Sequence, residues 1–543
     1  MFLFRWKNLK FRITPVLSRA IFWIILWTMV LPPVFAADNT LKFGLHVSAM
    51  GNLDPHFAAG SQDRAFADMV FNGLLRYQPG NAPKIEPDLA EAMPEFRMEG
   101  GRQIWTVILK KGVMFHDSPD VPAYELTADD VIFSLTKSAD KQYCAYSGNY
   151  TGMTLVKKGK YRLEIIPANP VSPVLFFPKI SNYGGGFIVS RKVIEKKGYE
   201  EFKTHPVGTG PFKFSSHLKD KYISLVANKD YFRGAPRLAG VEIHFMPELT
   251  DREAALNAGR MHVVTGSGEK GWILDIERKQ GITVDTHGAG EVGTVHLNMT
   301  VPPLNDIRVR KAIAYALGRQ GFLDTISSRI SGPVFSPVPD QFLPGGIPEK
   351  EATLLRLTYA RDLPRAVKLL ADAGYAQGFT LDLVSSEKRV YRRAYEVLAR
   401  QLADVGIKCN VRVVPHSEMH RVIRKDPRPI VIYFAWRPNA DAYLTRFFHS
   451  DSIVVSGKRP DTNFSHYDKI DKIIEAARME TDPKTQINLW VQAQIRILND
   501  MAALPIMFGR NCYARRTSLD YGHTLVSTMA LYPQFTERTH LDD

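Results

Sequence analysis

A segment in the second half of the chain combines a large aromatic ring with charged and amide side chains, Tyr433-Phe-Ala-Trp-Arg-Pro-Asn-Ala-Asp-Ala-Tyr443. An indole ring in a polar, proline-bearing segment suits the covering of a small organic molecule in a cleft, although Trp436 could also pack in a core. The neighbouring Arg437 offers a planar fork of N–H donors that pairs with a carboxylate or a phosphate. A solvated guanidinium at the rim of a cleft is the plainer alternative. We therefore predict recognition of a small solute by this segment.

Motifs that would indicate catalysis are accidental or incomplete in this sequence. Gly288-Ala-Gly-Glu-Val-Gly293 matches the glycine fingerprint of dinucleotide sites, but that fingerprint requires a helix directly after it, so that free amides meet the pyrophosphate. Here a strand-like run follows, residues 294–299. Gly266-Ser-Gly268 lacks the flanking spacing of a nucleophile elbow. Because no nucleophile can be paired with a base, we predict that the chain is not an enzyme.

The histidines and cysteines give little support for a metal. His416 and His420 are four positions apart, so on a helix they could hold a metal ion together or be two ordinary surface histidines, and we favour the second reading. The three cysteines, Cys144, Cys409 and Cys512, show no metal-ligand spacing, and their odd number allows at most one disulfide. We expect no metal site and no cofactor.

The first residues predict export from the cytoplasm. Five basic residues and no acid occupy the first 19 positions, an apolar run begins at Ala20, and Val34-Phe-Ala36 ends it. This is the pattern of a secretory signal cleaved after Ala36, so we predict a signal peptide over residues 1–36. An uncleaved anchor is the alternative, but the run is shorter than the roughly 20 residues of a membrane span. No cysteine lies near the cut, which argues against a lipoprotein and predicts a free periplasmic protein.

Charge and length define the class of protein. The whole chain has 70 Lys and Arg against 56 Asp and Glu, a net charge of +14, and removal of the five basic residues of the signal leaves 65 against 56, a net of +9. Because the basic residues are interspersed with acids, we expect no nucleic-acid partner. Roughly 500 mature residues exceed what one hydrophobic core usually serves, so two or three domains are expected.

Strand and helix patterns alternate in the second half of the chain, which predicts an α/β lobe with helices on a sheet. We expect strands over residues 40–47, 101–115, 293–299 and 407–414, and helices over residues 65–75, 127–135, 306–317, 364–373 and 392–405.

Several segments in a fixed order carry a family resemblance over nearly all of the mature chain. They are Pro87-Asp-Leu-Ala-Glu-Ala92, Trp105-Thr-Val-Ile-Leu-Lys-Lys-Gly-Val-Met-Phe-His-Asp117, Thr127-Ala-Asp-Asp-Val-Ile-Phe-Ser-Leu135, Val207-Gly-Thr-Gly-Pro-Phe212, Asn228-Lys-Asp-Tyr-Phe232, Leu304-Asn-Asp-Ile-Arg-Val-Arg-Lys-Ala-Ile-Ala-Tyr-Ala-Leu-Gly-Arg319, Leu369-Leu-Ala-Asp-Ala-Gly-Tyr375 and Leu402-Ala-Asp-Val-Gly-Ile407. Together they resemble the signature blocks of the family 5 extracellular solute-binding proteins, which include dipeptide- and oligopeptide-binding proteins.

The resemblance implies a two-lobed periplasmic binding protein fold of the α/β class, with a ligand cleft at the hinge and an extra subdomain in the first lobe. On this basis we expect lobe I over residues 37–294, with the inserted subdomain at about 90–200. Lobe II is expected over residues 295–504, and a C-terminal segment, residues 505–543, returns to lobe I.

The resemblance also suggests where the ligand lies. In peptide-binding relatives a Trp is followed three positions later by an Asp that pairs with the α-amino group of the ligand. Trp436 matches the Trp, but Asn439 stands in place of the Asp, and Asp441 could take over if the loop is shifted. The resemblance further places cleft walls in the loop 48–54 and the segment 298–300. The predicted ligand-binding residues are Met50, Asn52, Asn298, Tyr433, Trp436, Arg437, Asn439 and Asp441.

The implied function is capture of a peptide or peptide-like solute for an ABC importer, with a permease and ATPase complex at the inner membrane as partner and a monomer as the expected state. A nickel chelate, haem or a glycan remains an alternative ligand in the same fold. A hydrolase of envelope peptides and an envelope chaperone are weaker alternatives.

Overall fold

The computed structural model describes residues 39–58, 60–82, 84–324, 326–425, 428–529 and 531–542. The predicted signal peptide, residues 1–36, lies outside them. Within these ranges no helix is both long and apolar enough to cross a bilayer.

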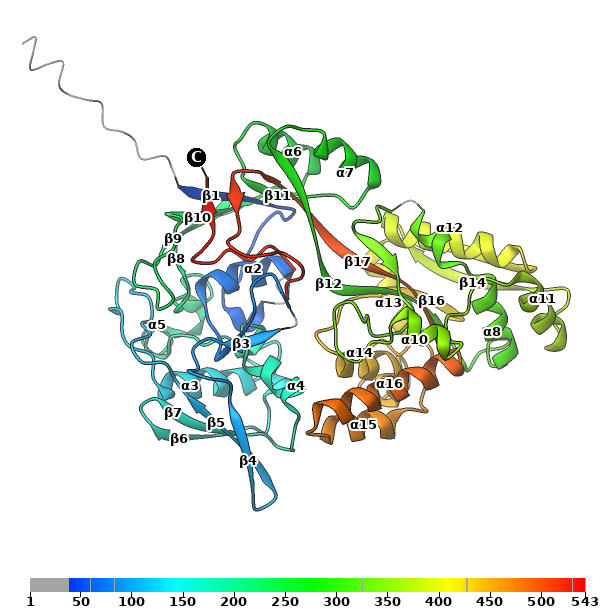
Figure 1. Cartoon of the computed structure of the whole chain (residues 1–543), viewed down its shortest axis with the longest axis horizontal. Helices are drawn as coiled ribbons and strands as arrows, with labels where there is room; N and C mark the ends of the chain where they lie inside the picture. Colours follow the sequence, from blue (N-terminus) through cyan, green and yellow to red (C-terminus); the bar gives the residue numbers. More distant parts are fainter. Residues whose placement is uncertain are drawn as a thin grey trace, which may run out of the picture. The chain divides into compact units, whose positions relative to one another are not determined.

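A nine-stranded mixed sheet forms the centre of the fold, with strand order β16-β12-β17-β11-β1-β10-β9-β8 and β13 added beside β17. Two of its strands are unusually long, β12 (Ile282–Leu297) and β17 (Ala503–Arg516), and they pair antiparallel with each other (Figure 1). One end of this pair adjoins β11 (Val263–Thr265), and the other end adjoins β16 (Ile430–Ala435). The predicted strand at 293–299 is therefore the second half of a strand that begins at Ile282.

The ladder between β12 and β17 is irregular at its middle. Its register shifts between Gly288 and Glu291 and again between Gly293 and Thr294. A Cβ atom on Gly288 would lie 1.8 Å from the Phe342 ring, so only glycine fits there without a rearrangement. The six-residue glycine motif lies inside this strand, and the predicted strand after it is confirmed.

Most elements of the first lobe pack around one large apolar core, which includes Phe43, Phe71, Trp105 and Phe176, while its last two helices contribute to a smaller apolar cluster. Strands β1 and β10 pair in parallel in its part of the central sheet. Its elements are β1 (Thr40–Leu45), α2 (Ser61–Val70), β2 (Leu75–Tyr77), β3 (Ile85–Pro87), β4 (Glu95–Glu99), β5 (Arg102–Ile108), α3 (Ala128–Ala139), β6 (Thr154–Gly159), β7 (Arg162–Ile166), α4 (Pro173–Phe176), α5 (Arg191–Phe202), β8 (Phe212–Leu218), β9 (Tyr222–Ala227), β10 (Gly240–Phe245), α6 (Leu249–Asn257) and α7 (Lys270–Glu277), with short 3-10 turns at Pro55–Phe57, Ser147–Asn149, Phe177–Ile180 and Gly184–Gly186.

A separate antiparallel sheet, of order β4-β5-β7-β6, lies in the part of the first lobe where the family resemblance implies an extra subdomain. The hairpin of β4 and β5 projects from the rest of this lobe (Figure 1). Trp105 on β5 is buried and stacks on Phe176 of α4, with ring centroids 4.3 Å apart. This contact joins the small sheet to α4, which follows Ser172, a residue that contacts the second lobe.

The second lobe packs helices around β16 and a parallel pair, β14 and β15. Its elements are α8 (Ile307–Ala316), α9 (Arg319–Leu323), β13 (Ser331–Pro333), α10 (Glu349–Leu354), α11 (Leu363–Asp372), β14 (Phe379–Ser386), α12 (Arg389–Ala403), β15 (Ile407–Val414), α13 (His416–Lys425), α14 (Ala440–Phe448), α15 (Asp471–Met479) and α16 (Pro483–Asn499), with a 3-10 turn at Ser450–Ser452. The expected α/β class and two-lobed fold are confirmed.

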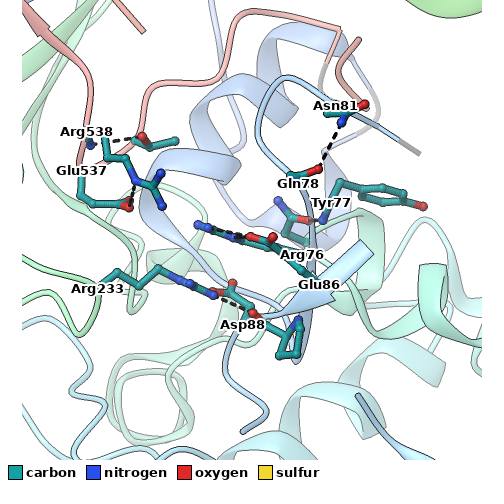
Figure 2. Close-up of polar contacts among 12 residues, drawn as sticks. Arg76, Tyr77, Gln78, Asn81, Glu86, Asp88, Arg233, Glu537 and Arg538 are labelled. Atoms are coloured by element: carbon teal, nitrogen blue, oxygen red, sulfur yellow. Dashed lines mark hydrogen bonds and ion pairs between the residues drawn. The ribbon is translucent and has the colours of Figure 1, made fainter. Parts of the chain in front are cut away.

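After β17 the chain packs against the first lobe, where β18 (Leu519–Asp520) pairs with β19 (His540–Leu541). Gln534 accepts a hydrogen bond from the Gly80 amide at 2.9 Å and donates to the Asp68 carboxylate at 2.6 Å. Figure 2 shows the polar cluster beside this contact, in which Arg76 pairs with Glu86 at 2.8 Å. The C-terminal segment is thus held by buried polar contacts as well as by apolar packing.

Candidate functional site

A cavity of about 650 Å³ lies between segments from both lobes. Residues 146–185 and Arg64 line it from the first lobe, while residues 436–446 and 478–479 line it from the second. The two lobes also touch beside the cavity, where Ser172 donates a hydrogen bond to Gln486 of α16 at 2.7 Å and both side chains are buried. A ligand in this cavity would contact both lobes at once.

Trp436 follows the end of β16 and places its ring in the cavity. Its centroid lies 5.9 Å from that of Tyr183 in the first lobe. The Arg64 guanidinium lies 4.8 Å from the Tyr183 centroid and 5.4 Å from the Trp436 centroid, close enough to both rings for cation–π attraction. The indole N–H of Trp436 is buried and has no acceptor in the described part of the chain. Because buried donors are normally hydrogen-bonded, this N–H is a candidate donor to an acceptor atom of a ligand.

Arg437 lies beside Trp436 and is mostly buried. Its Nη1 donates to the carbonyl oxygen of Trp436 at 2.9 Å, and its guanidinium stacks over Phe447 at 4.8 Å. Its Nε is buried without an acceptor among the described residues. Burial lowers the pKa of Arg437, and the neighbouring Arg446 lowers it further. The guanidinium of Arg437 thus lines the cavity, and only some of its N–H donors have a protein acceptor.

Asp441 is engaged by a protein cation. Its carboxylate accepts a hydrogen bond from Arg478 Nε at 2.9 Å, and the same guanidinium contacts the Thr445 hydroxyl. Burial raises the pKa of Asp441, while Arg478 opposes that rise. The carboxylate that could have replaced the missing Asp is therefore committed to Arg478.

Asn439 begins a helix. Its side-chain oxygen accepts a hydrogen bond from the Ala442 amide at 2.9 Å, which makes it the N-cap of α14. Asparagine is among the preferred residues at this position because its oxygen satisfies a free helix amide. Asn439 lines the cavity, and its capping bond gives a local reason for an amide at this position.

The structure brings together four of the eight predicted residues, Trp436, Arg437, Asn439 and Asp441, and places the other four outside this cavity. Tyr433 lies in the core of the second lobe, with its hydroxyl accepting a hydrogen bond from Arg424 at 2.9 Å. Met50 is buried in the core of the first lobe, and Asn52 accepts a hydrogen bond from the Asp54 amide. Asn298 is fully buried and holds Thr300 through its side-chain oxygen.

Several residues that line the cavity were missed by sequence reasoning. Lys179 lies in the turn Phe177–Ile180, where its carbonyl oxygen accepts a hydrogen bond from the Tyr150 hydroxyl at 2.8 Å. Tyr183 precedes the turn Gly184–Gly186. The glycine run at 184–186 beside a tyrosine was the available signal, since such a run marks a tight backbone approach.

His416 and His420 contact each other on α13. Arg424 donates to His420 Nδ1 at 2.8 Å, the two Nε2 atoms are 3.1 Å apart, and His416 Nδ1 lies 3.0 Å from Ser386 Oγ. Because a guanidinium only donates, a neutral His420 carries its proton on Nε2 and donates to His416. No group of three or more His, Cys, Asp or Glu side chains that could hold a metal ion is found among the described residues.

Comparisons with known proteins support a binding role. A family model described as bacterial extracellular solute-binding proteins, family 5 middle, matches residues 84–453. The di/tripeptide-binding protein 2 of Pseudomonas aeruginosa (strain UCBPP-PA14) is 25% identical over 506 residues, which is 87% of this chain and 90% of that protein. The heme-binding protein A of Haemophilus influenzae is 22% identical, with 87% of each chain covered. The solved structure of MoaA from A. tumefaciens R10 in complex with mannopinic acid is 34% identical, with a TM-score of 0.75, 93% of this chain and 100% of that one covered.

Proposed function

The chain belongs to the family 5 bacterial extracellular solute-binding proteins, and we propose that it captures a peptide or peptide-like solute in the cavity around Trp436 for an ABC importer. One observation carries this proposal. Tyr183 from the first lobe and Trp436 from the second contact each other, with ring centroids 5.9 Å apart, in the wall of a cavity of about 650 Å³, a volume typical of small-molecule sites. A solute bound in the cavity beside the two rings would contact both lobes.

Closure of the two lobes would be the signal that the importer reads. We place the lobe boundary near residue 295 and the return near residue 505, inside β12 and β17. The irregular ladder at Gly288/Glu291 and Gly293/Thr294 lies next to these positions, and its lost hydrogen bonds make bending easier there. The hinge would then consist of two adjacent strands.

The proposed location is the periplasm, after cleavage of residues 1–36. The proposed partners are a permease and an ATPase at the inner membrane, with the chain itself acting as a monomer. Binding rather than catalysis fits a cavity whose described polar side chains are arginines, a lysine, tyrosines, amides and one threonine, with one carboxylate already paired to Arg478.

A non-peptide solute is a second candidate in the same site. The observation that favours it is the engagement of Asp441 by Arg478, because the described residues of the lining include no other carboxylate for the amino terminus of a peptide. Mannopinic acid, the ligand bound to MoaA, is a reasonable first probe because MoaA is 34% identical to this chain.

A thermal-unfolding screen of residues 37–543 tests the proposal. Short peptides, amino-blocked peptides, glutathione, mannopinic acid, glycans, nickel chelates and haem would each be added in excess. A ligand at 100 times its dissociation constant stabilises the folded state by about 2.7 kcal/mol, which a melting curve detects. A hit that Trp436→Ala abolishes supports the proposed site. If none of these solutes shifts the melting temperature, or if a hit is unaffected by Trp436→Ala, the proposal is wrong.

A further inference from the structure

The cavity around Trp436 has a strongly unbalanced charge. Five basic residues line it, Arg64, Lys179, Arg437, Arg446 and Arg478, and Asp441 is the only acidic residue among the described residues of its lining. The imbalance is much greater than in the mature chain as a whole, which has 65 Lys and Arg against 56 Asp and Glu. A concave surface of one sign concentrates ions of the opposite sign, because low-dielectric walls focus the field.

Two of these cations already have protein partners. Arg478 pairs with Asp441 at 2.9 Å, and Arg446 pairs with Asp461 at 2.9 Å on the outer side of the same region. The Arg446 side chain is 54% exposed, so water also solvates it. Of the other three, Arg64 has interactions of its own within the protein, and Lys179 and Arg437 also bring positive charge to the lining.

Lys179 is one such residue, on the wall formed by the first lobe. No carboxylate of the described residues lies within ion-pairing distance of its ammonium group. Burial lowers the pKa of Lys179, and the negative charge of Asp441 opposes this shift. A desolvated ammonium without a counter-ion is destabilising, so a ligand anion beside it would be favourable.

Arg437 is the second, on the wall formed by the second lobe. In the described part of the chain its donors reach only the carbonyl of the preceding residue, and no carboxylate pairs with it. Burial and the like charge of Arg446 lower the pKa of Arg437, and the Asp461 carboxylate opposes them. Stacking on Phe447 holds the guanidinium plane in position. A guanidinium held in a fixed plane with N–H donors left without acceptors suits an anionic oxygen group such as a carboxylate.

We infer that the solute carries at least one anionic oxygen group, such as a carboxylate, which Lys179 from the first lobe and Arg437 from the second lobe bind together in this cavity. The inference rests on the proposed function and narrows its ligand class. An anion held by one cation from each lobe would couple recognition to closure. The same geometry disfavours a ligand recognised through a free amino group, because such a group needs a carboxylate that is not already paired.

The test uses matched probes that differ in charge. Binding of mannopinic acid, glutathione, Glu-Glu and phosphoserine to residues 37–543 would be compared with binding of Gln-Gln amide and Lys-Lys amide by calorimetry. We expect anionic probes to bind and the neutral and cationic ones to fail, with affinity falling as salt is raised. The carboxylate probes and phosphoserine separate the two sources of an anionic group.

Two substitutions locate the site. Arg437→Gln and Lys179→Gln should each raise the dissociation constant of the best anionic probe by about tenfold or more, the usual cost of one charge-assisted hydrogen bond. Arg278→Gln and Lys157→Gln are matched controls, because both side chains are exposed and lie outside the cavity lining. Melting curves without ligand establish that each variant is folded, and the salt dependence of the unmodified protein gives a reading that needs no variant.

The outcomes are distinct. Preference for the neutral or cationic probes, or unchanged affinity for an anion in both variants, overturns the inference and leaves the proposed solute-binding function standing. Failure of every probe of every charge to bind overturns both.

Discussion

The ion pair of Asp441 and Arg478 allows a prediction with a worked magnitude. Arg478→Gln removes the cation 2.9 Å from a carboxylate whose side chain is only 18% exposed. An exposed ion pair contributes about 1 kcal/mol or less, whereas breaking a buried pair costs about 3 to 5 kcal/mol. Because Arg478 is 32% exposed, this pair lies between the two limits. We expect the free energy of unfolding at pH 7 to fall by about 2 kcal/mol.

The pH dependence gives the sign of the same effect. Burial already raises the pKa of Asp441, and loss of Arg478 would raise it further above the value in the unfolded chain. A carboxyl group with a raised pKa binds more protons in the folded state, so its contribution to stability grows as pH falls. The deficit of Arg478→Gln should therefore be largest near pH 7 and shrink toward pH 5.

Urea unfolding of the ligand-free protein at pH 7, 6 and 5 measures this deficit. The double variant Asp441→Asn, Arg478→Gln is the matched control, since neither charge remains and most of the lost stability should return. A deficit that is equal at the three pH values, or a double variant as unstable as Arg478→Gln alone, would refute the reasoning.

Three further predictions concern separate parts of the molecule. Trp436→Ala should remove ligand-induced stabilisation in melting curves and should also lower the ligand-free melting temperature, because the ring packs against Tyr183 and the cluster of Tyr77, Ala82 and Met529. Burial and Arg424 lower the pKa of His420 to about 4, below its value in the unfolded chain. The stability that the neutral form of His420 contributes should therefore be complete above pH 6.5 and should be lost as pH falls through 4. Unfolding curves of His420→Asn and of the unmodified protein, compared across this pH range, should show the difference. Gln486→Ala removes the acceptor of the Ser172 hydroxyl between the lobes and should weaken ligand affinity several-fold by calorimetry, with Gln492→Ala on the same helix as control. An unchanged affinity in Gln486→Ala would show that this contact does not contribute to closure.

Much of the fold was predictable because its elements have strong local patterns. The predicted strand at 407–414 coincides with β15, and the predicted helix at 364–373 differs by one residue at each end from α11. Alternating β-branched residues define the first, and apolar residues at helical spacing define the second. The start of β12 was missed because its first half is rich in glycine and polar residues, and it is a strand through its pairing with β17. That pairing connects residues more than 200 positions apart.

The candidate site was predictable only in the part that is contiguous in sequence. Trp436 and Arg437 stand out in one segment, and the same segment has the uncharged Asn439 where peptide-binding relatives have an Asp. The capping role of Asn439 and the pairing of Asp441 with Arg478 depend on helix packing, which no local pattern reveals. Lys179 comes from the other lobe, about 260 positions earlier in the chain. Its place opposite Arg437 follows from tertiary structure alone.

The two long central strands have a mechanical consequence. β12 and β17 are hydrogen-bonded to each other from Ile282 and Arg516 at one end to His296 and Ala503 at the other, through both lobes. A hydrogen-bonded ladder resists sliding of one strand along its neighbour, whereas a sheet bends and twists with little loss of bonding. The strand pair should therefore resist sliding of the strands but bend easily, most of all where the ladder is irregular. This strand pair would restrict the relative motion of the two lobes to one bending direction. Binding of a solute would then move the lobes along that direction alone.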